Sequence, residues 1–471
     1  MKKKPLIIIT SVISLIALIS VPLTMDIMLY ALPNVYNETY YGEMKDKIDL
    51  LKNKSNKRII LIGGSSVPFS VDSHYLKQYL PDYNPVNFGL YASLGTNMML
   101  DIVSKYIRTD DIVIITPEIS NQTLSMYYNG NEALKALENN KDLLFTLNNK
   151  LSQSILGAIP VFNSEKISYI SKNNIPHPED IYSHDSFNEY GDIKVNREGN
   201  ILLGGVDYNN MINLDTSIID KDFIKYLNSF NDKCLKKSAK CYFRFSPMND
   251  ASIINKNNLE NLYNYLDESL HFEIMGDPYN AVLEKEYFYD TNYHLNTSGA
   301  IKWSKQLIKD IKLTLDDSTT TDIVELDKPD LINPSDDKDV NNEHVHYFTY
   351  TESGNNYFIN GLSEQGKTSI KVTLPYRYND KVITHFKDDL FMNSNIEEIT
   401  IQSNIRMISD YSFKNSKIKK IIIDNDYPNT IAVGDHLLDG CTANIYVKKV
   451  NYTKYKTSYS WSKYSSRIKQ L

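Results

Sequence analysis

The stretch RIILIGGSSVPFSVDS, residues 58–73, decides the fold that we expect for the first part of the chain. Its apolar run, residues 59–62, ends abruptly in two glycines, a pattern that predicts a buried strand followed by a tight turn. Open α/β sheets place their reactive groups at the carboxyl edge of such strands. Ser65 is therefore a candidate nucleophile, and Ser66 is the alternative one residue further on.

Beyond this stretch, short apolar strands alternate with amphipathic helices up to about residue 313. Strands are predicted at 58–62, 85–89, 112–116, 241–245 and 272–275, and helices at 72–80, 95–107 and 297–313. Residues 119–240 are less regular and are expected to carry insertions over the sheet edge. This alternation predicts an α/β domain over residues 58–313, with a parallel sheet that is covered on both faces.

A second motif, YFYDTNYHLNTSGA at residues 287–300, offers partners for a nucleophilic serine. A serine hydroxyl attacks well only when an imidazole takes its proton and a third group orients that imidazole. His294 lies between Asp290 and a capped helix start at Thr297, which is the context of a loop that leads into a helix. We therefore predict His294 as the base and Asp290 as the orienting carboxylate.

The chain changes character twice after the α/β domain. Residues 314–345 are acidic and poor in large apolar side chains, which predicts a solvated linker. The segments 382–401 and 405–423 then superimpose at an offset of 22 residues. A repeat of this length is typical of a leucine-rich solenoid, so residues 346–471 are predicted to form a small one. Its other parts would be a strand at 370–375, an irregular third turn at 436–447 and a C-terminal cap over 455–471.

The N-terminus has the pattern of a membrane anchor. Three lysines, residues 2–4, precede an apolar run that continues, weakened by Asp26, to Leu32. This pattern predicts a cytoplasmic tail (1–4), one transmembrane helix (5–32) and a stalk helix (33–57). The alternative is a cleaved signal peptide, whose apolar core is shorter, about 7–15 residues. Both interpretations place the rest of the chain outside the cytoplasm, and the first predicts a single-pass protein of the cell membrane.

The composition bears on partners and cofactors. The formal net charge of −7, from 51 basic and 58 acidic residues, predicts no basic surface for nucleic acid. Cys234 and Cys241 flank a short lysine-rich loop, so they could form a disulfide in an oxidising compartment or remain two thiols, while Cys441 is expected to stay free. His344 and His346 lack a third ligand at a fitting spacing. We therefore expect neither a metal nor a cofactor.

The motifs at residues 58–73 and 287–300 resemble those of the SGNH (GDSL-like) hydrolase superfamily. The resemblance is strongest to membrane-anchored members that accompany membrane-bound O-acyltransferases and to the D-alanyl transfer proteins of teichoic acid synthesis. It implies a three-layer α/β/α, flavodoxin-like domain with a parallel sheet over residues 58–313, in which Gly63-Gly64-Ser65 is the first conserved block of the family. The C-terminal part resembles the leucine-rich repeats of bacterial surface antigens.

The resemblance also implies which residues surround the nucleophile. Its second block corresponds to VNFGLYASLG (86–95), and its third block, Gly-x-Asn-Asp in the family, appears here as TPEISNQ (116–122). The fifth block, Asp-x-x-His in the family, is one residue longer in this chain. Glu118 would either line the site or be an ordinary loop carboxylate. The candidates for oxyanion binding or for the pocket are therefore Gly64, Ser66, Gly89, Ser93, Glu118 and Asn121.

Two functional hypotheses follow from these residues and from the resemblance. The first is an extracytoplasmic serine-dependent O-acyltransferase, with acetyl as the expected acyl group, or an esterase. Either enzyme would act on a cell-surface or secreted polysaccharide through an acyl-serine intermediate. The resemblance implies a membrane-bound O-acyltransferase as its partner. The second hypothesis is a non-catalytic surface protein that binds a glycan or a protein through its repeats, because a fold does not by itself confer activity.

Overall fold

The computed structural model describes residues 27–471, except for 54–56, 179–180, 198, 330, 332–340, 354–355, 380, 393, 409–410, 427, 429–430, 435 and 459–460. The chain divides into two compact units. The first runs to His177 and also contains Ser183–Asn200 and Val206–Asp330. The second contains Pro178–Tyr182, Ile201–Gly205 and Leu331–Leu471.

The first unit is built on a four-stranded sheet whose strands all run parallel. Its order is β2-β1-β3-β4, formed by β1 (Lys57–Gly63), β2 (Tyr83–Gly89), β3 (Ile112–Ile115) and β4 (Lys240–Phe243). The strands are almost entirely buried, which explains why they have continuous apolar runs rather than alternating ones. Gly63 at the end of β1 pairs with Gly89 at the end of β2, so the carboxyl ends of these strands share one edge.

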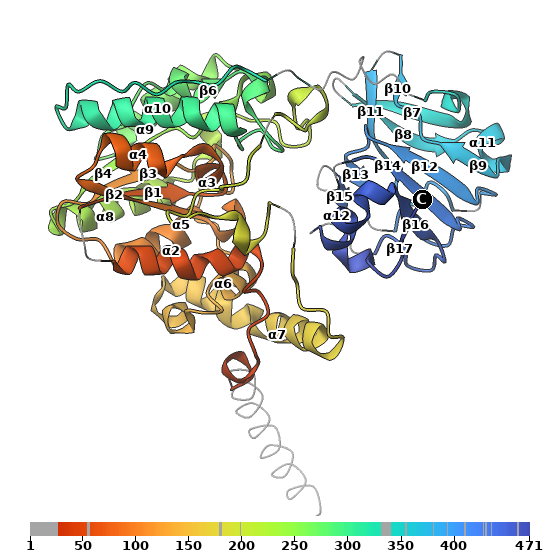
Figure 1. The fold of residues 1–471 in the computed structure, drawn as a ribbon, viewed down its shortest axis with the longest axis horizontal. Coiled ribbons are helices and arrows are strands. Elements are labelled where there is room, and N and C mark those ends of the chain that lie inside the picture. Colours follow the sequence, from red (N-terminus) through yellow and green to blue (C-terminus); the bar gives the residue numbers. More distant parts are fainter. Residues whose placement is uncertain are drawn as a thin grey trace, which may run out of the picture. The chain divides into compact units, whose positions relative to one another are not determined.

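Helices cover both faces of this sheet (Figure 1). The first unit contains α2 (Glu43–Lys52), α3 (Ser66–Ser70), α4 (Ser73–Tyr79), α5 (Thr96–Ser104), α6 (Gly130–Ala136), α7 (Asn149–Ser171), α8 (Lys221–Lys236), α9 (Asn258–Ser269) and α10 (Thr297–Thr314). Figure 1 shows α4 and α10 over one face and α2 and α5 over the other. The expected stalk, residues 33–57, contains α2, whose Met44 and Ile48 are fully buried in the core of the first unit.

The region between the sheet and the last helix is less regular than its apolar pattern predicts. A small parallel sheet joins β5 (Met248–Asn249) to β6 (Val282–Leu283). The strand predicted at 272–275 is absent among the described residues, where only an isolated bridge links Phe243 to Ile274. The insertion at 119–240 contains α6, α7 and α8. Cys234 and Cys241, at the junction of α8 and β4, are buried free thiols, and burial raises the pKa of the Cys241 thiol.

Two sheets form the second unit. One contains, in order, β15 (Ala432–Val433), β13 (Met407–Ile408), β11 (Lys381–Phe386), β8 (Asn356–Leu362) and β7 (Phe348–Ser353), with β10 (Arg377–Tyr378) paired to β11. The other contains β17 (Ile468–Gln470), β16 (Asn444–Val447), β14 (Lys420–Asp424), β12 (Glu398–Gln402) and β9 (Lys371–Thr373). The short helices are α11 (Glu364–Thr368) and α12 (Tyr452–Thr457). Pairing is parallel except at β7 and β10.

The repeat in the sequence sets the register of both sheets. Glu398 of β12 pairs with Lys420 of β14, and His385 of β11 pairs with Met407 of β13, each 22 positions apart. Equivalent apolar side chains therefore stack in one core between the sheets. The C-terminal segment, expected to be a cap, also contributes the strand β17, because Ile468 continues the buried row of Ile445.

The fold class expected from the sequence needs correction. The chain is mixed α/β with several sheets, some of them parallel, and no helix in the described part of the chain is long and apolar enough to cross a membrane. The transmembrane helix predicted at 5–32 falls mostly on residues 1–26, which lie outside the described residues. At its described end, residues 27–32, Leu29 is buried, whereas Ile27 and Tyr30 are 58% and 56% exposed.

Candidate active site

Ser65, His294 and Asp290 form one chain of hydrogen bonds. Ser65 Oγ lies 2.7 Å from His294 Nε2, and His294 Nδ1 lies 2.8 Å from Asp290 Oδ1. Ser65 follows β1 after one residue, Gly64, and is the N-cap residue of α3, so its hydroxyl stands at the carboxyl edge of the sheet. The side chains of His294 and Asp290 are only 5% and 6% exposed, whereas Ser65 is half-buried and reachable from outside.

The loop that carries Asp290 and His294 is a narrow hairpin. Phe288 bridges Leu295 in antiparallel fashion, and the backbone N–H of Tyr289 donates to the carbonyl of His294 (2.8 Å). At the tip, Thr291 Oγ1 accepts from the backbone N–H of His294 (3.0 Å). The three residues between Asp290 and His294 form this turn. The carboxylate therefore reaches Nδ1 although the spacing is one residue longer than Asp-x-x-His.

Asn296 fixes the base of this hairpin to the next helix. Its Nδ2 donates to the carbonyls of Glu286 (2.7 Å) and Phe288 (3.1 Å). Its Oδ1 accepts from the backbone N–H of Gly299 (3.0 Å) and so caps the N-terminus of α10. One buried amide thereby ties the position of His294 to a helix that packs on α3 and α4.

Phe69 and Arg197 support the imidazole of His294, and neither residue was predicted from the sequence. The Phe69 ring stacks on the His294 ring, with centroids 4.0 Å apart and an interplanar angle of 13°. Arg197, from the insertion, lies over the Phe69 ring, with Cζ 5.4 Å from the ring centroid, and donates to the carbonyls of Phe69 (3.1 Å) and Leu295 (2.9 Å). Burial lowers the pKa of Arg197 to about 10, so the guanidinium stays charged at neutral pH.

Glu118 lies against the turn that presents the nucleophile. Its Oε1 accepts from the backbone N–H of Ser66 (2.8 Å), and its Oε2 is buried without a hydrogen-bond partner among the described residues. A Cβ atom at Gly64 would collide with the carboxylate of Glu118, so a larger residue there would require this side chain to shift. Of the two expected roles, the structure therefore places Glu118 at the site, under the turn.

Tyr293 links the hairpin to the loop that carries Glu118. Its hydroxyl donates to the carbonyl of Ile119 (2.7 Å), and burial, followed by the charge of Glu118, raises its pKa. The hydroxyl is therefore a neutral donor at neutral pH. This hydrogen bond connects the hairpin that carries His294 to the loop after β3.

Gly89, at the end of β2, is an oxyanion candidate that the fold brings next to the turn. A Cβ atom there would lie 2.5 Å from Val67 Cβ and 2.7 Å from the Gly64 carbonyl oxygen. Its N–H makes only a long hydrogen bond, 3.2 Å, to Asn87 Oδ1. Backbone N–H groups in such a position can donate to an oxygen that gains negative charge.

The other candidates differ in their surroundings. Ser66 Oγ is buried and has no hydrogen-bond partner among the described residues, so Ser65 and not Ser66 faces the imidazole. Ser93, in the 3-10 helix Ala92–Leu94, donates to Glu132 Oε2 (3.4 Å). Asn121 is exposed in the loop after β3. The arrangement as a whole can accept a proton from Ser65 and hold the resulting imidazolium beside a carboxylate.

Comparisons with known proteins bear on the second unit. Residues 377–468 match a family model described as the BspA type leucine rich repeat region, in 6 copies. No match is found among curated proteins. Among solved structures, the crystal structure of protein YXIM from Bacillus subtilis is similar, with 10% identity and a TM-score of 0.26 over 55% of this chain and 57% of that chain.

A TM-score this low carries no argument about the first unit. These comparisons also give no support to its resemblance to the SGNH superfamily. They do support the repeat that the 22-residue offset predicted. The C-terminal part of this chain, over residues 377–468, is a leucine-rich repeat region of the BspA type.

Proposed function

We propose that the first unit is a serine-dependent acyl-transfer enzyme, either an O-acyltransferase or an esterase. The observation that carries this proposal is the chain of hydrogen bonds from Ser65 Oγ through His294 to Asp290, at 2.7 and 2.8 Å. The same three groups activate a serine on several unrelated folds. The likeness of the sequence motifs to the SGNH superfamily supports the same chemistry.

The proposed reaction begins when Ser65 Oγ attacks the carbonyl carbon of an acyl ester while its proton passes to His294 Nε2. Asp290 stabilises the imidazolium through the Nδ1–H bond. The backbone N–H groups of Ser65 and Gly89 would face the oxygen that becomes negative, because the N–H of Ser66 already donates to Glu118. His294 then gives its proton to the departing alcohol, which leaves an acyl-serine.

The second half of the reaction regenerates Ser65. A hydroxyl of the acceptor gives its proton to His294 Nε2 and attacks the acyl carbon, and the proton then returns to Ser65 Oγ as the bond to the acyl group breaks. Water as the acceptor makes the enzyme an esterase. A sugar hydroxyl makes it an acyltransferase, and we propose a cell-surface or secreted polysaccharide as that acceptor and a membrane-bound O-acyltransferase as the source of an acetyl group, both on the strength of the motif resemblance.

The proposal is tested by comparing Ser65→Ala with Ser66→Ala in the purified chain. A fluorophosphonate probe should label the wild type and Ser66→Ala but not Ser65→Ala, because only Ser65 is hydrogen-bonded to the imidazole. Hydrolysis of a chromogenic acetyl ester should fall at least ~10³-fold in Ser65→Ala. Labelling that survives in Ser65→Ala, or no labelling of a folded wild type, would refute the proposal.

A further inference from the structure

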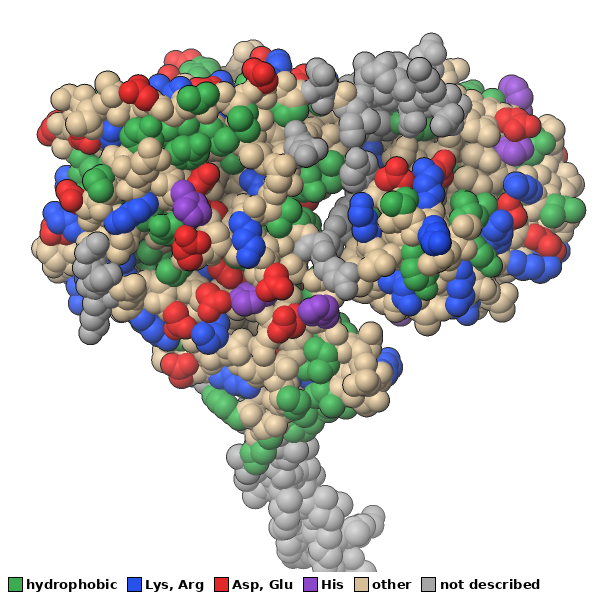
Figure 2. Space-filling view, viewed as in Figure 1, with side chains coloured by type: hydrophobic (Ala, Val, Ile, Leu, Met, Phe, Trp, Pro, Cys, Tyr) green, Lys and Arg blue, Asp and Glu red, His purple; other side chains and the backbone are tan. Residues whose placement is uncertain are grey.

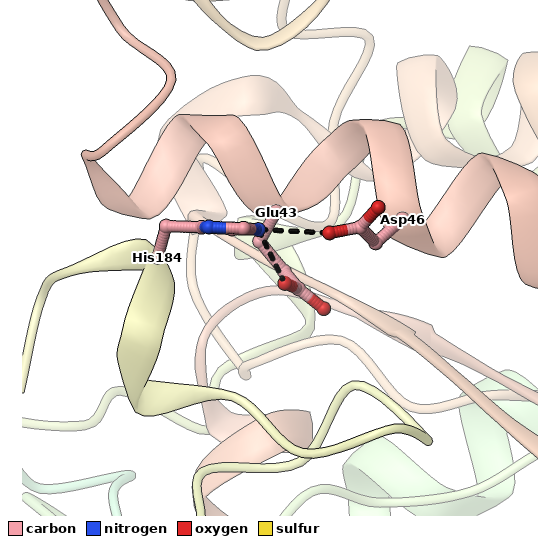
Figure 3. A group of neighbouring side chains, drawn as sticks. All are labelled: Glu43, Asp46 and His184. Atoms are coloured by element: carbon pink, nitrogen blue, oxygen red, sulfur yellow. Dashed lines mark hydrogen bonds and ion pairs between the residues drawn. The ribbon is translucent and has the colours of Figure 1, made fainter.

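Glu43, Asp46 and His184 converge on one point outside the candidate active site (Figure 3). Glu43 and Asp46 are three residues apart in the first turns of α2, which places them on one face of the helix. His184 begins a 3-10 turn (His184–Ser186) in the insertion. Its backbone N–H donates to the carbonyl of Glu38 (3.1 Å), and this bond holds the turn beside α2.

The spacing of the three side chains suits a small cation. His184 Nε2 lies 2.8 Å from Asp46 Oδ2 and 3.6 Å from Glu43 Oε2, and one such atom from each residue lies within 4.8 Å of the other two. Ligands of a tetrahedral zinc ion, with bonds of about 2.0–2.2 Å, stand about 3.3–3.5 Å apart. Figure 3 shows the tip of the imidazole facing both carboxylates. Small side-chain adjustments would therefore bring all three within bonding distance of one ion.

The surroundings of Glu43 are a second observation that favours a bound cation. Its side chain is 4% exposed, and no hydrogen bond to its carboxylate is found among the residues that the structure describes. Its nearest charged groups stand at longer range, with Lys47 Nζ 3.8 Å from Oε1 and His184 Nε2 3.6 Å from Oε2. Buried carboxylates normally accept several hydrogen bonds or bind a metal, because burial of an unsatisfied one is costly.

The pocket beside this group favours positive charge. It measures about 440 Å³ and is lined by Glu43, Asp46 and His184 together with Asp49, Asp185 and Glu189. The cation Lys194 also lines it. Lys47 does not occupy the pocket, because its Nζ is buried and donates to the carbonyls of Asn87 (2.9 Å) and Gly191 (2.6 Å). An ion bound at Glu43 Oε2 would thus share the carboxylate with Lys47 and leave room for water as a further ligand.

We propose that Glu43, Asp46 and His184 bind one divalent transition-metal ion of the zinc class. An imidazole nitrogen beside two carboxylates favours such an ion over Mg²⁺ or Ca²⁺, which prefer oxygen ligands alone. The ion would bind His184 Nε2 in place of the present contact between Nε2 and Asp46 Oδ2. This inference stands apart from the role proposed for Ser65.

The proposed ion would link the 3-10 turn His184–Ser186 of the insertion to α2. Downstream of His184, Asp192 accepts from the backbone N–H of Ser73 (2.7 Å), and Arg197 reaches the carbonyls around His294. The segment that begins at the cation site therefore ends behind the imidazole of the candidate active site. The role of the ion would be structural, because none of its ligands lies in that site.

The test uses the full chain without a histidine tag, stripped with a chelator and titrated with ZnCl₂ by calorimetry and by thermal unfolding. We expect one Zn²⁺ per chain and a higher Tm with the ion. His184→Ala and Asp46→Asn should each bind at least ~100-fold more weakly, because even the loss of a group that only orients a metal ligand costs 10–100-fold. Circular dichroism of both variants checks that they are folded.

Two matched controls keep the result specific. Asp49→Asn removes a carboxylate from the same pocket but not from the cluster, and His74→Ala removes an exposed histidine that lies between Asp72 and Glu189. Both should bind zinc like the wild type. Three results would overturn the proposal: no zinc binding by the wild type, unchanged binding by folded His184→Ala, or an equal loss in the controls. Tighter binding of Mg²⁺ or Ca²⁺ than of Zn²⁺ would overturn the class of metal.

Discussion

At the scale of single residues, Gly64 and Glu118 depend on each other. The carboxylate occupies the space that a Cβ atom at Gly64 would need, and it accepts the N–H of Ser66 one residue beyond the nucleophile. The three atoms nearest to that Cβ position all belong to Glu118. The side chain of Glu118, from the loop after β3, thus limits the space at the turn that presents Ser65.

We expect Gly64→Ala to destabilise the first unit by about 1–3 kcal/mol, because the added methyl group collides with Glu118. Glu118→Ala should cost a similar amount, about 1–3 kcal/mol, because it leaves the Ser66 N–H without its acceptor. The double variant should cost clearly less than the sum of the two, since the space that Glu118 vacates accepts the methyl group. Urea unfolding of the four proteins measures this coupling, and strictly additive losses would show that the contact is unimportant.

Local sequence patterns predicted the residues of the hydrogen-bonded chain, but not the residues that pack around the imidazole. Ser65 and His294 stand in local motifs, a strand that ends in two glycines and a loop before a capped helix, and the structure brings the two side chains together. Phe69 stacks on the imidazole of His294, and Arg197 lies over Phe69. Both contacts arise from tertiary packing, so no local spacing in the sequence could reveal them. The cluster of Glu43, Asp46 and His184 joins a helix to a distant turn, with 138 positions between Asp46 and His184. A separation of this length has no recognisable metal-ligand spacing in the sequence.

At the scale of elements, the parallel strands of the first unit are joined at their starting ends by a buried ion pair. Arg58 of β1 reaches Asp111, just before β3, with Nε to Oδ1 at 3.0 Å and Nη2 to Oδ2 at 2.5 Å. Both side chains are almost completely buried, with 1% and 0% exposed. The geometry is bidentate, which suits a guanidinium facing a carboxylate.

Asp111→Asn should lower the free energy of unfolding by about 3–5 kcal/mol, because it leaves the buried guanidinium of Arg58 without a counter-charge. The matched control is Asp110→Asn at the next position. Its side chain is 56% exposed and lies 3.6 Å from Lys57, so we expect a change below about 1 kcal/mol. Denaturant unfolding compares the two variants, and equal losses would mean that the buried pair contributes no more than the exposed one.

Elements with strong local patterns were predictable, and those defined by tertiary pairing were not. The strands predicted at 58–62 and 112–116 lie within β1 and overlap β3, since continuous apolar runs need burial on both faces. The run at 272–275 is interrupted by Glu273 and, within the described residues, pairs only through an isolated bridge at Ile274. The offset of 22 residues predicted the pairing of β12 with β14 because strands of successive turns stack in register.

At the scale of the whole molecule, the chain has two compact units with separate cores. The core of the second unit is made from side chains between Phe348 and Ile468, and both of its sheets are complete within that range. Ser65, Asp290 and His294 all belong to the first unit. Folding of the repeats and assembly of the candidate site are therefore expected to be independent.

A fragment of residues 341–471 should fold by itself and unfold in one cooperative thermal transition, because its core needs no side chain from elsewhere. Phe413→Ala in this fragment provides the control. It removes a fully buried ring that stacks on Phe391, at 5.5 Å between centroids, and should cost about 3–5 kcal/mol. A fragment that shows no cooperative transition by circular dichroism would mean that the repeats need the first unit in order to fold.

The hydrogen bond between Ser65 and His294 joins residues that are 229 positions apart in the chain. A ribosome that adds about 5–20 residues per second needs roughly 10–50 s to make the intervening segment. During that interval the emerging serine has no imidazole beside it and is an ordinary hydroxyl. The timing of synthesis thus keeps the nascent chain unreactive until the first unit is nearly complete.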